Sequence, residues 1–112
     1  MYRITVTYGQ PADSEAFDRH YEQVHAPLAA QLPGLRSFTT LKGEALDDAA
    51  SPWYFQANLY FADKDAALAA LGSETGQAAG ADIANFATGG ATLAGGHETE
   101  VAVAHAAEQV AP

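Results

Sequence analysis

The stretch WYFQANLYF, residues 53–61, carries the clearest strand pattern in the chain. Apolar side chains recur at every second position, as they do in a strand that turns one face toward a core. The odd-numbered residues are expected on one face and the even-numbered residues on the other; they are Trp53, Phe55, Ala57, Leu59 and Phe61 against Tyr54, Gln56, Asn58 and Tyr60. This pattern predicts a sheet at the centre of the fold.

The segments on either side of this strand predict the rest of the topology. Residues 2–8 alternate in the same way, and residues 35–42 predict another strand. Helices are expected to start at Asp13 or Ser14, at Asp63 and at Ser73, because these side chains suit helix N-termini. In the glycine-rich residues 89–96, Gly89-Gly90 and Gly95-Gly96 are expected to form turns that flank a short strand, and the last strand is expected around residues 99–103.

The resulting order, βαββαβ, is typical of a ferredoxin-like α+β fold with both helical segments on one face of the sheet. The chain has 112 residues, enough for one domain. We expect that domain to span residues 1–104, and residues 105–112 to form a frayed tail.

The second face of the predicted sheet indicates a partner. Helices cover one face only, and the other is expected to carry a mixture of polar and aromatic side chains, namely Thr5, Thr7, Phe38, Tyr54, Asn58 and Tyr60. A bare aromatic-rich face is unusual for a monomer. Covering it with a second copy is the simplest solution, since two-fold pairing is the commonest symmetry. The sequence therefore predicts a homodimer.

Composition argues against several classes of function. The formal net charge is −9 with five Lys and Arg, so nucleic acid and anionic membranes would be repelled by most of the surface. There is no cysteine, which leaves no disulfide and no thiolate chemistry. No segment resembles a signal peptide or a membrane span, so we expect a cytoplasmic protein.

The helix that begins near residue 13 holds the densest group of chemically capable side chains. Phe17, Tyr21, Val24 and Leu28 are expected to form its apolar stripe, flanked by His20 on one side and His25 on the other. Imidazole gives and takes protons near neutral pH. His25, with Tyr21, is therefore the candidate catalytic pair, although histidines in such positions also serve purely structural roles.

Other residues are candidates for a binding pocket. His20, Trp53, Tyr54, Phe61 and Phe86 are the candidate substrate-binding residues, and the aromatic ones among them have core packing as the alternative role. Pro27 removes a backbone donor late in the helix, which predicts a kink or an early end there. The four histidines lack the spacing of a metal site, so we expect no metal and no cofactor.

Three motifs together resemble the EthD family. The first is Phe17-Asp18-x-His20-Tyr21-x-x-x-His25-x-Pro27-Leu28 with Leu32-Pro33-Gly34-Leu35, and the second is Tyr54-x-x-Ala57-x-Leu59-Tyr60-Phe61 followed by Asp63. The third is Ser73-x-x-Gly76-Gln77 with Ala81-Asp82-Ile83-x-Asn85-Phe86. The resemblance spans residues 2–93. It implies a dimeric α/β barrel with a pocket between sheet and helices, a role in the catabolism of ethers and aromatics or in polyketide metabolism, and proton transfer by His25.

Two functions remain open at this level. The first is a cofactor-free enzyme, such as an oxidoreductase, decarboxylase or isomerase, that acts on a small aromatic, quinone-like, polyketide or ether compound. His25 would then move a proton while Tyr21 or Tyr54 holds a substrate oxygen. The alternative is a non-catalytic carrier of small ligands, or a stress-related barrel protein that binds haem through His25.

Overall fold

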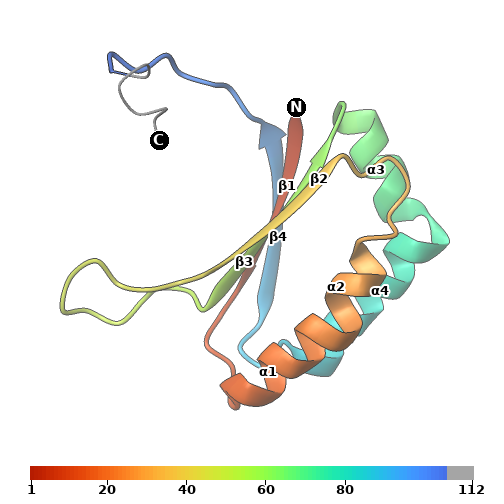
Figure 1. The fold of residues 1–112 in the computed structure, drawn as a ribbon. Coiled ribbons are helices and arrows are strands. Elements are labelled where there is room, and N and C mark those ends of the chain that lie inside the picture. The colour runs from red at the N-terminus through yellow and green to blue at the C-terminus, as the bar shows by residue number, and fades with distance from the viewer. Residues whose placement is uncertain (106–112) are drawn as a thin grey trace.

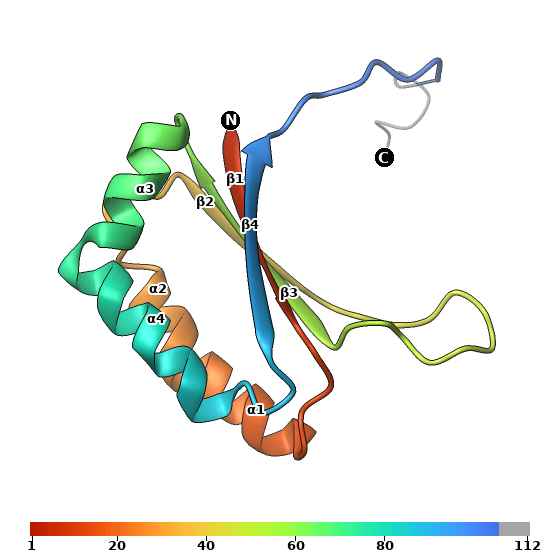
Figure 2. The same ribbon diagram turned by 180° about the vertical axis from the view of Figure 1, so that it is seen from behind.

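The protein is a four-stranded antiparallel sheet with its helices packed on one face (Figures 1 and 2). The structure is a computed structural model, and it describes residues 1–105; the expected tail thus lies almost entirely outside the described residues. The elements in chain order are β1 (Tyr2–Tyr8), α1 (Ser14–His20), η1 (Tyr21–His25), α2 (Ala26–Ala29), β2 (Ser37–Lys42), β3 (Phe55–Phe61), α3 (Lys64–Gly72), α4 (Glu74–Phe86) and β4 (Ala91–His97). This confirms the ferredoxin-like α+β fold.

The sheet order is β2-β3-β1-β4, with β1 and β3 at the centre. Val6 pairs with Ala57 and Ile4 with Leu59, and all of these side chains are buried under the helices. The expected faces of residues 2–8 and of the residues from 55 to 61 are therefore correct. Phe61 and Tyr8 are fully buried, and burial of each large apolar side chain contributes about 1.5–3 kcal/mol.

The open face of the sheet is more polar than the sequence predicted. Phe38 pairs with Leu59 and therefore points to the helical side, since directly paired residues share a face. Tyr54 precedes β3, and its ring packs against Phe17 of α1. The prediction that these two aromatic side chains lie on the open face was wrong. Thr5 instead donates a hydrogen bond to Asn58 across that face, over 3.0 Å.

The last strand lies earlier than expected. It spans Ala91–His97, and residues 99–103 form no strand. A Cβ on Gly95 would lie 2.5 Å from the hydroxyl of Tyr2, so a larger residue there would displace the Tyr2 side chain. Gly90 does form a turn, with φ of 90°. Gly95 thus marks a close approach within a strand, and the expectation that Gly95 and Gly96 form a turn was wrong.

The first helical segment changes its winding ahead of Pro27. Residues Tyr21–His25 form a π-helical turn, in which the N–H of Ala26 donates to the carbonyl of Tyr21. Pro27 has no N–H to donate, and the helix nevertheless continues to Ala29. The wider turn moves the buried stripe onto Phe17, Tyr21, His25 and Ala29. Val24, expected in that stripe, is 46% exposed.

No helix among residues 1–105 is both long and apolar enough to cross a membrane.

The loop between β2 and β3 extends beyond the sheet, on the side away from α3 (Figure 1).

Candidate functional site

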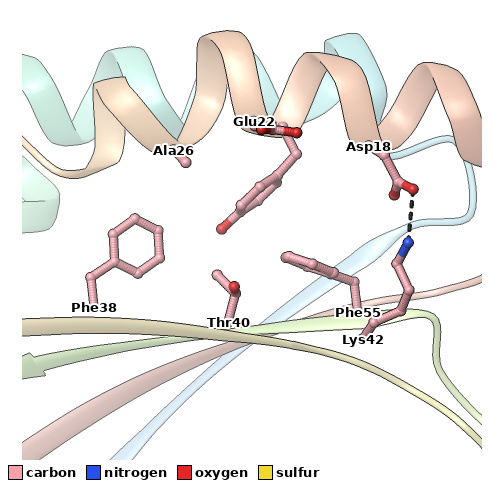
Figure 3. Close-up of a pocket in the computed structure, with 8 residues that line it drawn as sticks. Asp18, Glu22, Ala26, Phe38, Thr40, Lys42 and Phe55 are labelled. Atoms are coloured by element: carbon pink, nitrogen blue, oxygen red, sulfur yellow. Dashed lines mark hydrogen bonds and ion pairs between the residues drawn. The ribbon is translucent and has the colours of Figure 1, made fainter.

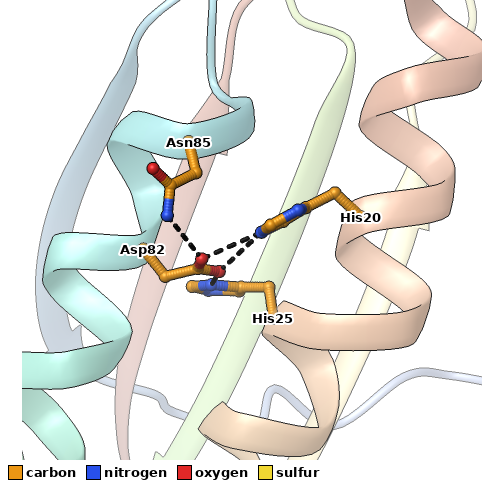
Figure 4. Close-up of polar contacts among 4 residues, drawn as sticks. All are labelled: His20, His25, Asp82 and Asn85. Carbon is orange, nitrogen blue, oxygen red and sulfur yellow. Dashed lines mark hydrogen bonds and ion pairs between the residues drawn. The ribbon is translucent and has the colours of Figure 1, made fainter.

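One buried carboxylate connects helix α4 with the first helical segment, which consists of α1, η1 and α2. Asp82 of α4 accepts a hydrogen bond from Nε2 of His20 at 2.9 Å and another from Nδ1 of His25, also at 2.9 Å. Asn85, one turn further along α4, donates to the same carboxylate over 3.0 Å. Figure 4 shows these three side chains converging on Asp82 between the helices. The cluster of His20, His25, Asp82 and Asn85 is called the histidine–aspartate cluster below.

Local structure explains how these side chains meet. The π-helical turn places His25 on the buried side of its helix, directly following Tyr21 in the stripe. Such turns insert one residue into a helix and are common at functional sites. On the other helix, the Ser73 side chain caps α4 by accepting from the N–H of Gly76. Asp82 then shares the buried face of α4 with Ala79 and Phe86.

The contacts within the cluster determine the protonation states of Asp82 and His25. Burial opposes the charge on Asp82, but the hydrogen bonds from Asn85, His20 and His25 outweigh it and hold the pKa of the carboxyl below its ordinary value. Burial also lowers the pKa of His25, and Asp82 only partly offsets this. At neutral pH an ionised Asp82 therefore accepts from a neutral His25 that carries its proton on Nδ1. Nε2 of His25 is left with a free lone pair.

Aromatic rings enclose the cluster. The ring of Phe86 stacks on His20 with centroids 5.2 Å apart and lies 4.8 Å from the ring of His25. The ring of Tyr21 also lies near His25, with centroids 5.2 Å apart. The hydroxyls of Tyr8 and Tyr21 are buried and have no hydrogen-bond partner among residues 1–105. Such orphaned groups are rare and costly in folded proteins, which makes them candidates for contact with a ligand.

Two cavities are bordered by Tyr21 or His25. The larger, of about 480 Å³, lies between the first helical segment and strands β2 and β3 (Figure 3); it is lined by Asp18, Tyr21, Glu22, Ala26, Phe38, Thr40, Lys42 and Phe55. The smaller, of about 50 Å³, is almost entirely apolar and borders His25. Tyr21 lines the larger cavity and contacts His25, so its ring forms part of the wall between His25 and that cavity.

A polar clasp closes one end of the larger cavity. Asp18 accepts from Nζ of Lys42 at 2.8 Å and from the hydroxyl of Tyr54 at 2.7 Å. The ammonium of Lys42 also lies 5.4 Å from the centre of the Tyr54 ring. Asp18 and Lys42 therefore neutralise each other, whereas Glu22, which forms no ion pair with any of residues 1–105, adds a negative charge at this cavity.

The predicted site residues fall into two groups. The structure brings together His20, His25, Tyr21 and Phe86 in or beside the histidine–aspartate cluster. The other three lie apart from it. Phe61 is fully buried in the core, Trp53 packs beside Gly43 in the β2–β3 loop, and Tyr54 belongs to the clasp.

Sequence reasoning assigned no role to Asp82 or Asn85. A signal was present, because Asp82 falls three residues after Ala79 and four before Phe86, on the apolar face of its helix. A carboxylate at such a position requires a buried partner. Across residues 1–105, no group of three or more His, Cys, Asp or Glu has the arrangement of a metal site.

The fold is that of a ferredoxin-like α+β protein, with the histidine–aspartate cluster between its two helical segments. The model of the EthD domain matches residues 9–90, and the chain belongs to the EthD family. It is 46% identical to an uncharacterized 11.0 kDa protein from the thcB-thcC intergenic region of Rhodococcus erythropolis, over 83% of this chain and 90% of that one. The resemblance seen in the sequence motifs is thereby confirmed.

Solved structures give the same picture. An ethyl tert-butyl ether D (EthD) family protein from Bacillus halodurans superposes with a TM-score of 0.84 at 33% identity, covering 88% of this chain and 99% of that one. A dimeric ferredoxin-like protein from Jannaschia superposes with a TM-score of 0.63 at 23% identity, covering 88% and 100%. At this identity the second similarity concerns the fold alone.

Proposed function

We propose that this protein is a cofactor-free enzyme in which His25 transfers a proton to or from a small, largely apolar ligand. The observation that carries the proposal is the 2.9 Å bond between Nδ1 of His25 and the Asp82 carboxylate. That bond directs the free lone pair to Nε2, and the carboxylate stabilises the imidazolium that forms when Nε2 accepts a proton. A buried general base held in one tautomer is suited to abstract a proton beside a carbonyl.

The larger cavity supports binding of a small aromatic, quinone-like or lactone compound. Its volume of about 480 Å³ is in the range of small-molecule pockets, and its floor and walls carry Phe38, Phe55 and Ala26. The clasp leaves no net positive charge there, and Glu22 adds a negative one. An uncharged ligand, such as a phenol or ketone, is therefore favoured over a carboxylic acid.

Tyr21 is the better of the two tyrosine candidates for holding a substrate oxygen. The hydroxyl of Tyr54 already donates to Asp18, whereas that of Tyr21 has no partner among the described residues. In the proposed reaction, a shift of the Tyr21 ring opens His25 to the cavity. The hydroxyl of Tyr21 then donates a hydrogen bond to the substrate oxygen on which negative charge develops as His25 removes the substrate proton. Isomerisation is compatible with this first step, because the proton can return at another carbon, and so is cofactor-free oxidation in which dioxygen is the oxidant.

A homodimer is part of the proposal. The open face of the sheet carries hydroxyl and amide side chains that are hydrogen-bonded in pairs, with Thr5 donating to Asn58 and Gln56 to Thr7. The Jannaschia neighbour is described as dimeric. Pairing through this face predicts twice the chain mass of 11.7 kDa by light scattering at micromolar concentration. A mass equal to one chain would contradict it.

A ligand screen tests the enzyme. Thermal shift and Trp53 fluorescence would be measured with phenols, quinones, ketones, lactones and matched carboxylic acids, for the wild type and for His25→Ala. His97→Ala, at the end of β4, is the control for loss of a histidine elsewhere. We expect uncharged compounds to stabilise the wild type and the control, and turnover of any bound compound to be lost in His25→Ala. Equal turnover in His25→Ala, or binding of none of the panel, would contradict the proposal.

One observation favours the carrier as a second candidate. His25 is absent from the lining of the larger cavity, so a ligand there contacts Tyr21 before it reaches a base. A carrier would bind the same compounds, with equal affinity in His25→Ala, and convert none of them. Haem binding finds less support, because no histidine lines the larger cavity. The cavity that His25 does border has a volume of about 50 Å³, too small for a haem.

A further inference from the structure

The Asp82 carboxylate is shared by two histidines that differ in their access to solvent. The side chain of His20 is 27% exposed and that of His25 is 7% exposed. His20 lines an outer groove of about 380 Å³ together with Asn85 and Phe86, whereas His25 faces the small apolar cavity inside. Asp82 therefore connects the partly exposed His20 with His25, which is buried at the proposed reaction site.

We propose that His20 is a positioning residue that competes with His25 for the Asp82 carboxylate and so sets how strongly His25 holds a proton. This inference takes its functional meaning from the proposed role of His25 in proton transfer. It assigns to His20 an action through Asp82, in place of the direct contact with substrate that the sequence predicted.

The geometry of the bonds makes the competition direct. Nε2 of His20 lies 2.9 Å from Oδ1 and 3.1 Å from Oδ2 of Asp82, and Oδ2 is also the atom that accepts from His25. A second donor on the same oxygen weakens the first bond. When His20 is protonated, its positive charge next to the carboxylate also opposes a second positive charge on His25. The protonation of His25 therefore depends on His20 through the carboxylate that they share.

The remaining groups around the cluster change little near neutral pH. Burial raises the pKa of Tyr8 on β1 and of Tyr21 on η1, so both stay neutral. Asp13 and Arg19 line the outer groove with His20 and carry opposite charges. Of the ionisable groups around the cluster, His20 is thus the one that shares the Asp82 carboxylate with His25.

A titration followed by NMR tests this without any ligand. The chain has four histidines, so each imidazole signal can be assigned by its loss in a single variant. In His20→Ala, removal of the competing donor and of its charge should raise the titration midpoint of His25 by about one pH unit. His20→Gln, which keeps a neutral donor, should raise it by less. His97→Gln, remote from Asp82, should leave it unchanged.

The outcomes distinguish an effect of His20 on the protonation of His25 from simple packing of the His20 ring against Phe86. If His20 only packs against Phe86, His20→Ala lowers the melting temperature and leaves the His25 midpoint in place, which would overturn the proposal. A downward shift would overturn it as well. Should His20→Ala fail to fold, His20→Gln decides by the sign of the same shift. Because no ligand is present, failure here would leave the catalytic role of His25 standing, and failure of the ligand screen would leave this coupling standing.

Discussion

Replacement of Asp82 by asparagine removes the charge at the centre of the histidine–aspartate cluster while keeping the shape of the side chain. The native carboxylate accepts from His20, His25 and Asn85. Oδ1 faces the donors of both His20 and Asn85, so the amide oxygen of the introduced side chain is expected there. The amide nitrogen then takes the place of Oδ2, opposite Nδ1 of His25.

The energetic cost follows from the three bonds. A hydrogen bond to a charged partner contributes about 1.5–3 kcal/mol and a neutral one about 0.5–1.5 kcal/mol, so loss of the charge costs about 1 kcal/mol per bond. We expect Asp82→Asn to lower the free energy of unfolding by about 2–3 kcal/mol at pH 7. For a chain of this length each kcal/mol corresponds to about 4 °C, which gives a fall of about 10 °C in Tm.

The variant also changes the tautomer of His25. The new amide nitrogen donates to Nδ1, and the imidazole proton is driven to Nε2, the nitrogen proposed to accept the substrate proton. Chemical denaturation measures the stability, and long-range 1H–15N correlation spectra report which ring nitrogen carries the proton. Loss of turnover with retained fold is the expected functional result.

Asp18→Asn is the matched control. Asp18 also accepts from two side chains, but it lies at the surface with 39% of its side chain exposed, so its loss should cost less than about 1 kcal/mol. The reasoning is refuted if Asp82→Asn is no more destabilising than Asp18→Asn, or if His25 keeps its proton on Nδ1 in the variant.

Three further predictions follow from other parts of the structure. Tyr21→Phe removes a buried hydroxyl that has no hydrogen-bond partner among residues 1–105, and it should raise stability by about 1 kcal/mol while weakening ligand binding. Tyr60→Phe, whose hydroxyl donates to Glu98 at the surface, should change little in either assay. The pKa values of His25 and Asp82 are both lowered in the folded protein, so the unfolded chain binds these protons more readily. The free energy of unfolding should therefore be highest above about pH 6.5 and fall with decreasing pH, by up to about 1.4 kcal/mol per pH unit for each proton; a flat profile between pH 7 and 4 would contradict this. Gly95→Ala places a Cβ against the Tyr2 ring and should cost about 1–3 kcal/mol in denaturation, while Gly96→Ala points into open space and should cost less; equal effects would count against the close approach.

The sequence contained most of the fold because alternation is a local signal. Ile4, Val6, Ala57 and Leu59 lie where period-two patterning places them. The errors arose where a non-local contact decides the structure. Gly95 belongs to a strand because it pairs with Ile4 of β1, and nothing in the neighbouring residues indicates that. The prediction from regular helical spacing that Val24 is buried was also wrong, because the π-helical turn rotates every later residue around the helix axis.

The candidate site was predicted in part for the same reason. His25, His20 and Tyr21 lie close together on one helical segment, so their spacing alone brought them into consideration. Asp82 lies 57 residues beyond His25 along the chain, and only the packing of α4 against η1 brings the two together. The partner that determines the protonation of the histidines was therefore the residue hardest to identify from local pattern.

Deuterium exchange tests the central claim, proton transfer by His25, most directly. A ketone that binds in the ligand screen would be incubated in D2O, and loss of the 1H signal beside its carbonyl would be followed by NMR for the wild type and for His25→Gln. General base catalysis contributes about 10²–10⁴-fold, so the wild type should exchange this position at least 100 times faster than the variant while both bind the ketone. Equal exchange rates in the two proteins would contradict the account.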